Sequence, residues 1–400
     1  MYLMLASICK ENNMNLFFVT HLGQLSQVEA LIKYEKIINN ELIILYTNAN
    51  KKIPKLIQKN VSKDIFSNIS LVRLPIKPNL LHLSKLIKIY FIYKRIIFSK
   101  NYSNIYILSF ERHYAFIGSL AEKRGIKIHL IEEGTATYKF NDKGENIAPV
   151  DLGKSIRDKI SFFLIKYSPF FKKIKPALSY WKNFDCVYAA FPDKITNGFN
   201  FNRRKYFFVP ALGGTIDKDI VAIAERYNIG TTDCIYVNQR YPVDAILFAE
   251  EIISIFDELI VLNNWRKVFI KFHPKDSGDV KKVFNEAIEK SIHAQCFTII
   301  DEPAFLVEPI VQHSKPQAII GIASTALVYT PLLSAKTQAI CFGDLFLTRL
   351  TAKNAITVHA RGLISSHIEI VKRFDNLWEV MEVDGQLQLK IIRDNPSFSQ

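Results

Sequence analysis

The sequence has 400 residues, of which 49% are apolar and only 15 are Gly and 15 Pro. At about 150 residues per domain, this length predicts two domains, and the composition excludes a disordered or fibrous chain. The net charge is +14. Such an excess favours an anionic partner, whether nucleic acid, acidic lipid, acidic polysaccharide or a nucleotide donor, although a Lys-rich proteome would give the same balance.

The cysteines and the first residues exclude further classes of protein. Five cysteines are scattered along the chain without a CxxC or a Cys/His cluster, so we expect neither a disulfide framework nor a zinc site, but a reducing compartment. The opening MYLMLASICKENN lacks a positive n-region and a small-residue cleavage site, which argues against a signal peptide. The sequence contains no uninterrupted run of about 18 apolar residues, so we expect no membrane-spanning helix.

Short β-branched runs alternate with longer amphipathic stretches in the first third of the chain. Alternation with this period predicts a parallel sheet with helices on both faces. The predicted strands are 15–20, 42–46, 69–74, 104–110 and 126–134. The predicted helices are 25–38, 51–60, 80–98 and 114–124. The pattern loosens between residues 140 and 205.

The same alternation resumes after Pro210. The predicted strands are 234–239, 267–274, 296–300, 318–322 and 338–342. The predicted helices are 216–227, 244–257, 277–291, 304–313, 324–333 and 363–383, the last packing back on the first domain. We therefore expect an α/β protein with two Rossmann-like doubly wound domains, 1–205 and 206–400. That architecture is called GT-B among glycosyltransferases, and its ligands bind outside the carboxyl ends of the strands.

Two adjacent carboxylates, Glu132 and Glu133, end the predicted strand 126–134 and precede Gly134 and Thr135. Neighbouring carboxylates repel, which can raise the pKa of one of them and prepare it as a general base. Gly134 permits a backbone conformation that directs such a side chain. An ordinary acidic turn after a strand would have the same sequence pattern.

Two further motifs follow strands in the second half of the chain. His273, Pro274 and Lys275 close strand 267–274. A histidine there can donate to a phosphate, or it can cap a loop. Gly321 ends another strand, and Ser324 and Thr325 open a helix, where their hydroxyls can cap the helix or help to bind an anion. Together the three motifs suit glycosyl transfer from a sugar nucleotide with inversion.

At these residues the sequence resembles the bacterial capsular polysialyltransferases. The resemblance covers roughly residues 15–345. It is carried by THLGQ (20–24), RHYA (112–115), IEEGTATY (131–138), YVNQRY (236–241), FIKFHPK (269–275) and SKPQAIIGIASTALVYTPL (314–332). Phe272 stands before His273 where the family pattern leads us to expect Pro.

The resemblance implies a CMP-sialic acid-dependent sialyltransferase with no metal or other cofactor. Glu133 would be the general base, and His273 would bind the CMP phosphate and serve as acid. Ser324 and Thr325 would hold the same phosphate. The product would be α2,8-linked polysialic acid or a related linkage, made with a capsule biosynthesis and export complex. The enzyme would be cytoplasmic and peripheral on the inner face of a bacterial cytoplasmic membrane.

Other residues complete the expected site. The donor-binding set is His273, Pro274, Lys275, Gly321, Ser324, Thr325, Gln239 and Arg240. The acceptor set is Glu132, Gly134, Thr135, His21, Gln24, His113, Arg203 and Arg204. Lys51, Lys52 and Lys55 are further candidates for a basic groove that holds a polyanionic acceptor, free or lipid-linked. Each of these cations could equally be a solvated surface charge.

Three alternatives remain open from the sequence. The chain could add a single sialic acid to a lipooligosaccharide. It could instead be a non-catalytic polyanion-binding component of a capsule assembly, which the three intact motifs disfavour. Nucleic-acid binding is disfavoured because no nucleic-acid module is evident. The aromatic and basic segment 161–176 suits either a membrane interface or a core helix with a solvated face.

Overall fold

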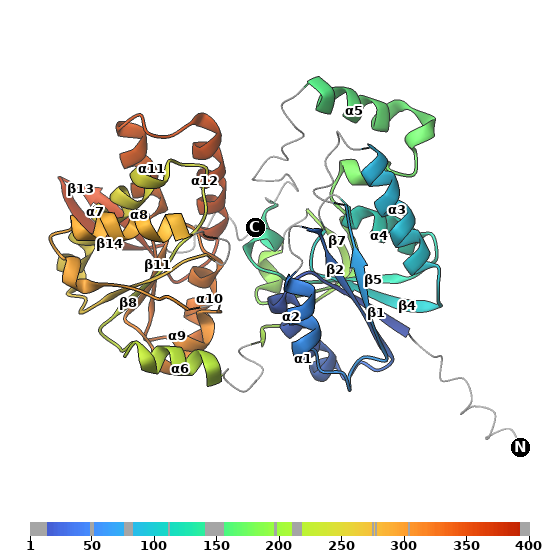
Figure 1. Ribbon diagram of the computed structural model, residues 1–400, viewed down its shortest axis with the longest axis horizontal. Coiled ribbons are helices and arrows are strands. Elements are labelled where there is room, and N and C mark those ends of the chain that lie inside the picture. The colour runs from blue at the N-terminus through green and yellow to red at the C-terminus, as the bar shows by residue number, and fades with distance from the viewer. Residues whose placement is uncertain are drawn as a thin grey trace, which may run out of the picture. The chain divides into compact units, whose positions relative to one another are not determined.

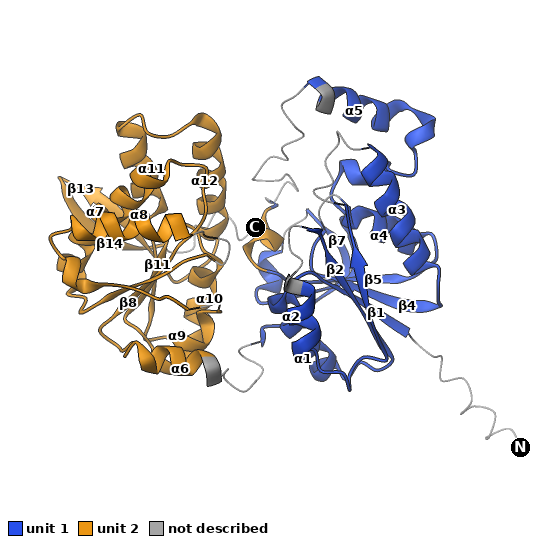
Figure 2. Cartoon of the chain, viewed as in Figure 1, with its two compact units in different colours: residues 1–133, 140–212 blue, residues 134–139, 213–400 orange. Residues whose placement is uncertain are grey.

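The computed structural model describes residues 14–48, 52–75, 83–110, 113–140, 156–195, 198–209, 218–273, 276, 278–302 and 305–392. The chain forms two compact units, shown in Figure 2. Unit 1 comprises residues 1–133 and 140–212, and unit 2 comprises 134–139 and 213–400. The division therefore falls seven residues after the expected 205/206 boundary, and six residues inside the expected first domain belong to unit 2.

Unit 1 is built on a seven-stranded sheet in the order β3-β2-β1-β4-β5-β6-β7. Figure 1 labels β1, β2, β4, β5 and β7 of this sheet and the helices α1 to α5. Every neighbouring pair is parallel. The strands are β1 (Met14–Val19), β2 (Asn40–Tyr46), β3 (Asn68–Arg73), β4 (Tyr102–Ile107), β5 (Lys127–Ile131), β6 (Asn183–Ala189) and β7 (Asn200–Tyr206). The helices are α1 (Leu22–Glu35), α2 (Lys52–Asn60), α3 (Leu83–Ile97), α4 (Tyr114–Glu122) and α5 (Ile156–Tyr167).

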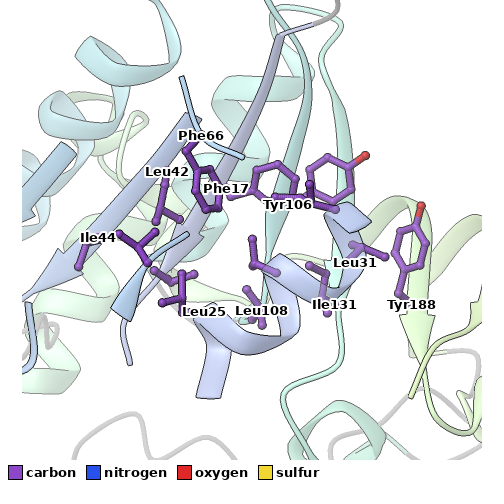
Figure 3. Close-up of a cluster of buried hydrophobic side chains, with 14 of the residues drawn as sticks. Phe17, Leu25, Leu31, Leu42, Ile44, Phe66, Tyr106, Leu108, Ile131 and Tyr188 are labelled. Carbon is purple, nitrogen blue, oxygen red and sulfur yellow. The ribbon is translucent and has the colours of Figure 1, made fainter. Parts of the chain in front are cut away.

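The core of unit 1 explains why its inner strands β1 and β2 are almost continuous apolar runs. Strands covered on both faces have no solvent side, so their side chains need not alternate. Phe17 of β1 stacks on Tyr106 of β4 with ring centroids 4.4 Å apart. Leu42, Ile44 and other buried side chains complete this cluster (Figure 3).

Unit 2 repeats the plan with the sheet order β10-β9-β8-β11-β12-β13-β14. Its strands are β8 (Cys234–Val237), β9 (Val268–Lys271), β10 (Phe297–Ile299), β11 (Ala318–Gly321), β12 (Gln338–Cys341), β13 (Leu377–Val383) and β14 (Gln386–Ile392). Its helices are α6 (Lys218–Arg226), α7 (Ala245–Asn263), α8 (Gly278–Glu289), α9 (Glu308–Ser314), α10 (Thr325–Leu333), α11 (Gly343–Ala352) and α12 (Val358–Val371). A 3₁₀ turn, η2 (Thr135–Tyr138), also belongs to this unit. The expectation of two doubly wound α/β domains is confirmed.

The expected helix 363–383 is wrong in its second half. Helix α12 stops at Val371, and residues 377–392 form the antiparallel hairpin β13–β14 at the edge of the unit 2 sheet. The turn is Asp384-Gly385, and both residues have positive φ, 50° and 75°. This is the backbone conformation of a tight hairpin turn, which Asp-Gly favours. None of the described helices is both long and apolar enough to cross a membrane.

Buried His129 makes the stability of unit 1 depend on pH. It lies within β5, only 3% exposed, with its ring stacked on Tyr106. Burial lowers the pKa of His129 from 6.5 to about 4. The unfolded chain therefore binds the proton more readily than the folded chain between these values, and stability is lost as the pH falls from 6.5 towards 4.

We expect His129→Gln, which keeps a hydrogen-bonding group beside Asn104, to remove this dependence. Between pH 7.5 and pH 5, the wild-type protein should lose about 2 kcal/mol more unfolding free energy than the variant. Urea unfolding at both pH values measures the difference. Equal losses in the two proteins would show that His129 does not titrate in this way.

Candidate active site

The carboxylate of Glu133 in unit 1 meets the imidazole of His21. The Nε2 atom of His21 lies 2.9 Å from Oε1 of Glu133, and the two side chains are 45% and 37% exposed. His21 follows β1 and Glu133 follows β5, so both stand at the carboxyl edge of the sheet. The strand order reverses between β1 and β4, and ligands of such sheets bind at this edge.

The histidine donates in this pair. His21 caps helix α1, and its Nδ1 accepts a hydrogen bond from the backbone N–H of Gln24. An Nδ1 that accepts carries no proton, so the ring proton resides on Nε2 and points to the carboxylate. In this contact the carboxylate of Glu133 is the hydrogen-bond acceptor.

The expected acceptor residue Gln24 supports this loop from within. It is buried, and its Oε1 accepts from the backbone N–H of Thr20 at 2.6 Å and from the Thr20 hydroxyl at 2.9 Å. These bonds close the turn between β1 and α1 that carries His21. Gln24 therefore fixes the loop rather than presenting its amide to solvent.

Glu132 and Glu133 have different environments. Glu132 is buried, and its Oε2 accepts from the backbone N–H of Ala190, just beyond β6. This contact ties the end of β5 to the end of β6, so Glu132 holds the sheet edge together. The exposed carboxylate of the pair is Glu133.

Gly134 occupies a backbone conformation that other residues avoid. Its φ is 153° and its ψ is −160°, a region essentially restricted to glycine. A Cβ there would lie 3.2 Å from Oγ1 of Thr325. Next along the chain, the hydroxyl of Thr135 contacts that of Thr325 at 3.1 Å. Within unit 2, the segment after Glu133 therefore packs directly on the start of α10.

Turn η2 makes a second set of contacts with other residues of unit 2. The guanidinium of Arg373 donates to the carbonyl of Tyr138 at 2.8 Å, and the ring of Phe374 packs edge-on against the ring of Tyr138. With the Thr135–Thr325 contact, these interactions hold both ends of the turn.

Gln239 contacts the residue before Ser324 where the strand order of unit 2 reverses, between β8 and β11. Oε1 of Gln239 accepts from the backbone N–H of Ala323 at 2.7 Å. Ser324 caps α10 by accepting from the N–H of Ala326. Gly321 permits this approach, because a Cβ on it would lie 3.3 Å from the carbonyl of Val237. A helix N-terminus with hydroxyl donors favours an anion.

Asp276 organises the loop of His273, a role that the sequence analysis missed. Its carboxylate is 2% exposed and accepts from the backbone N–H of His273 at 2.9 Å and from Asn238 at 3.0 Å. Arg240 lies 3.4 Å away as an ion-pair partner. His273 itself is partly exposed, and Pro274 and Lys275 lie outside the described residues. A polar residue three positions after a His-Pro turn was the available signal.

A buried charge behind this loop was also missed. Lys271 is buried at the end of β9, and that burial lowers the pKa of Lys271, which nearby Glu308 and Asp276 partly oppose. Burial raises the pKa of Glu308 in the first turn of α9, and Lys271 opposes that shift. A lysine in the apolar run KVFIKF was the sequence signal. The pair places a buried amine and a carboxyl group that interact electrostatically next to the His273 turn.

His113 is not brought to the Glu133 side chain. Its Nδ1 lies 2.8 Å from the hydroxyl of Tyr93, and its ring stacks on Tyr93 and Tyr114. Burial lowers the pKa of His113 to about 4. The ring therefore packs neutral between α3 and α4.

Arg203 and Arg204 lie on the edge strand β7, away from the carboxyl edge of the sheet. In the register of the sheet, Arg203 of β7 is paired with Cys186 of β6, and Cys186 is paired with His129 of β5. Glu133 stands four residues beyond His129, about 13 Å along the strand direction. Arg204 pairs with Asp193. Of the other expected cations, Lys55 is exposed, the side chain of Lys52 is not described, and Lys51 lies outside the described residues.

A basic groove lies beside the carboxyl end of β3, among residues that the sequence analysis did not single out. Its volume is about 730 Å³, within the usual range for ligand sites. Four cationic side chains line it, Arg73, Lys85, Lys88 and Arg95, together with apolar residues that include Phe91 and Leu74. Its described lining residues include no carboxylate, so the groove presents a positive potential.

Comparison with known families assigns the chain. The family described as "Alpha-2,8-polysialyltransferase (POLYST)" matches residues 15–342, which include every motif described above. The chain belongs to the alpha-2,8-polysialyltransferase family. It is a CMP-sialic acid-dependent sialyltransferase. No curated protein matches this polysialyltransferase significantly.

Solved structures similar to this polysialyltransferase share its GT-B fold. A protein assigned as a UDP-N-acetylglucosamine 2-epimerase from Listeria monocytogenes has a TM-score of 0.50 and 9% identity, over 93% of each chain. A UDP-GlcNAc 2-epimerase from Methanocaldococcus jannaschii has a TM-score of 0.49 and 11% identity, over 96% of each chain. At such identities the likeness concerns the fold alone.

We expect Gly134→Ala to impair this sialyltransferase at the site. An alanine at φ 153° is strained by about 1–3 kcal/mol, and its Cβ would press on Thr325. Activity should therefore fall at a temperature where the variant is still folded.

Gly125→Ala is the matched control, because Gly125 also has positive φ, 65°, but has open space around it. It should lose stability without a comparable loss of turnover. Sialyl transfer rates and thermal unfolding measure both effects. Wild-type activity in folded Gly134→Ala would disprove the importance of this contact.

Proposed function

We propose that the chain is an inverting polysialyltransferase that extends an α2,8-linked polysialic acid for a bacterial capsule. Glu133 is the general base in this proposal. The observation that carries it is the hydrogen bond from His21 to Glu133, which holds an exposed carboxylate at the ligand-binding edge of a doubly wound sheet.

The proposed step is a direct displacement. Oε2 of Glu133 takes the proton of the acceptor hydroxyl while the acceptor oxygen forms a bond to the anomeric carbon of the donor sialic acid. The bond from that carbon to the CMP phosphate breaks, and CMP leaves with the electron pair. Attack opposite the leaving group inverts the anomeric configuration. General base catalysis of this kind contributes about 10²–10⁴-fold.

Residues of unit 2 stabilise the leaving phosphate in the proposal. Ser324 and Thr325 offer hydroxyls at the start of α10, and His273 stands on a turn fixed by Asp276. Donors held in place before the reaction stabilise developing charge without reorganising. The chain itself links Glu133 to the start of α10, because Glu133 is bonded to Gly134 and Gly134 packs on Thr325. This link supports the proposal that Glu133 and Thr325 act on the same substrate. We propose no role for a metal.

The basic groove beside β3 is the proposed binding site for the acceptor chain. His21 follows β1, two strands from β3, and Glu133 follows β5, four strands from β3. At about 4.8 Å per strand, the groove lies roughly 19 Å across the sheet from Glu133. Only an acceptor several sugars long spans that distance, so a polyanionic chain would fit better than a single sugar.

We expect Glu133→Gln to lower the transfer rate by about 10²–10⁴-fold, because an amide cannot take the proton. CMP binding should stay near the wild-type value. The measurements are chain-length analysis of a labelled α2,8-oligosialyl acceptor and calorimetric titration with CMP. The wild-type protein should give a ladder of products, and addition of one sugar only would contradict a polymerase.

Glu132→Gln is the matched control. Its amide oxygen can still accept from Ala190, so the variant should fold and transfer nearly normally. Equal losses from both substitutions, or loss of CMP binding with Glu133→Gln, would remove the base role from Glu133.

Reversing charges in the groove should weaken the use of long acceptors more than that of short ones. We expect Arg73→Glu with Arg95→Glu to raise KM severalfold for long oligosialyl acceptors, because two attractive charges become repulsive. Acceptors of two or three sugars should be little affected. Lys59→Glu with Lys63→Glu, at exposed positions, matches the change in net charge. If short and long acceptors suffer alike, the groove does not bind the chain.

A further inference from the structure

Helix α5 and the 3₁₀ turn η3 (Pro169–Phe171) expose a row of large apolar side chains. The side chains of Ile156, Ile160, Phe163, Tyr167 and Phe170 are 54–92% exposed, with Phe170 the most exposed at 92%. A soluble surface carries single apolar side chains, but a contiguous row marks a surface that binds something apolar.

The row is one face of the helix. The first four of these residues are spaced by four, three and four positions, which places them on one side of an α-helix. Ser161 and Ile165 lie on the opposite side and are buried. On that side α5 packs on the short turn η4 (Lys175–Leu178), which packs on α4. The helix is thus held to unit 1 by one face, and its other apolar face points outward.

Lysines border the apolar row. Lys159 and Lys166 lie on α5, and Lys172, Lys173 and Lys175 follow it, all exposed. The ammonium of Lys166 lies 5.2 Å from the ring centroid of Tyr167, alongside the row. Residues 156–175 contain six Lys or Arg and one Asp. Such a border of long cationic side chains around aromatic groups matches a surface that is apolar inside and anionic outside.

We infer that α5 and η3 dock this protein on an anionic lipid surface. With twelve residues, α5 is about 18 Å long and too short to cross a bilayer core of about 30 Å. It lies in the plane of the interface, with Phe163, Tyr167 and Phe170 among the acyl chains. The lysine ammonium groups reach anionic headgroups. Each lysine near such a surface strengthens binding about fivefold.

Docking is independent of sialyl transfer, and its test needs neither donor nor acceptor. The full chain is sedimented with vesicles of phosphatidylcholine containing 30% phosphatidylglycerol, and with vesicles of phosphatidylcholine alone. We expect binding to the anionic vesicles that weakens as salt is added. A wild-type protein that stays in the supernatant with both vesicles would overturn the inference.

Substitutions then locate the surface. Phe163→Glu with Phe170→Glu should reduce vesicle binding at least tenfold, and Lys172→Gln with Lys173→Gln should reduce it on anionic vesicles. Ile292→Glu with Val358→Glu changes the charge equally at exposed apolar positions of unit 2 and should leave binding unchanged. Transfer to a soluble acceptor reports that each variant is folded.

Other occupants give distinct results. If the Phe163 and Phe170 variant binds vesicles as the wild-type protein does, the face is not a lipid-docking surface. If the substitutions instead abolish self-association measured by light scattering, with vesicle binding unchanged, the face pairs two copies of this chain. Either outcome refutes the lipid assignment without affecting the proposed base.

Discussion

The hydrogen bond between His21 and Glu133 depends on the order of strands in one sheet. The two residues are 112 positions apart in the chain, and strand order places the ends of β1 and β5 on either side of β4. Gln24 and Thr20 hold the histidine loop, and Glu132 holds the glutamate loop to the end of β6. An exposed carboxylate is held in one direction only by such supports.

Much of the fold follows from the periodicity of the sequence. The buried strands of both sheets are short apolar runs, and the helices between them have amphipathic spacing, so their order along the chain was predictable. The hairpin β13–β14 was missed although QLQLKII alternates and Asp384-Gly385 favours its turn. The amphipathic helix α12 comes just before β13 and has a similar share of apolar residues. The prediction therefore continued the helix through β13.

The candidate site was predictable to the level of motifs but not of contacts. Strand ends pointed to Glu133, His273 and Ser324. Whether a polar residue at a strand end faces solvent or supports its neighbours depends on tertiary packing. Glu132, Gln24 and His113 all proved to be packed groups, and the support from Asp276 was missed because its partner Asn238 lies 38 residues away in the chain.

The six residues 134–139 belong to unit 2, while the chain on both sides of them belongs to unit 1. The backbone therefore passes from one unit to the other at three places, and two of these flank a single short turn. The anchors of this turn, the Thr135–Thr325 contact and the Arg373–Tyr138 hydrogen bond, lie within unit 2, and the turn begins just after the peptide bond that follows Glu133. Any shift of these anchors would therefore also move the backbone that carries the Glu133 side chain.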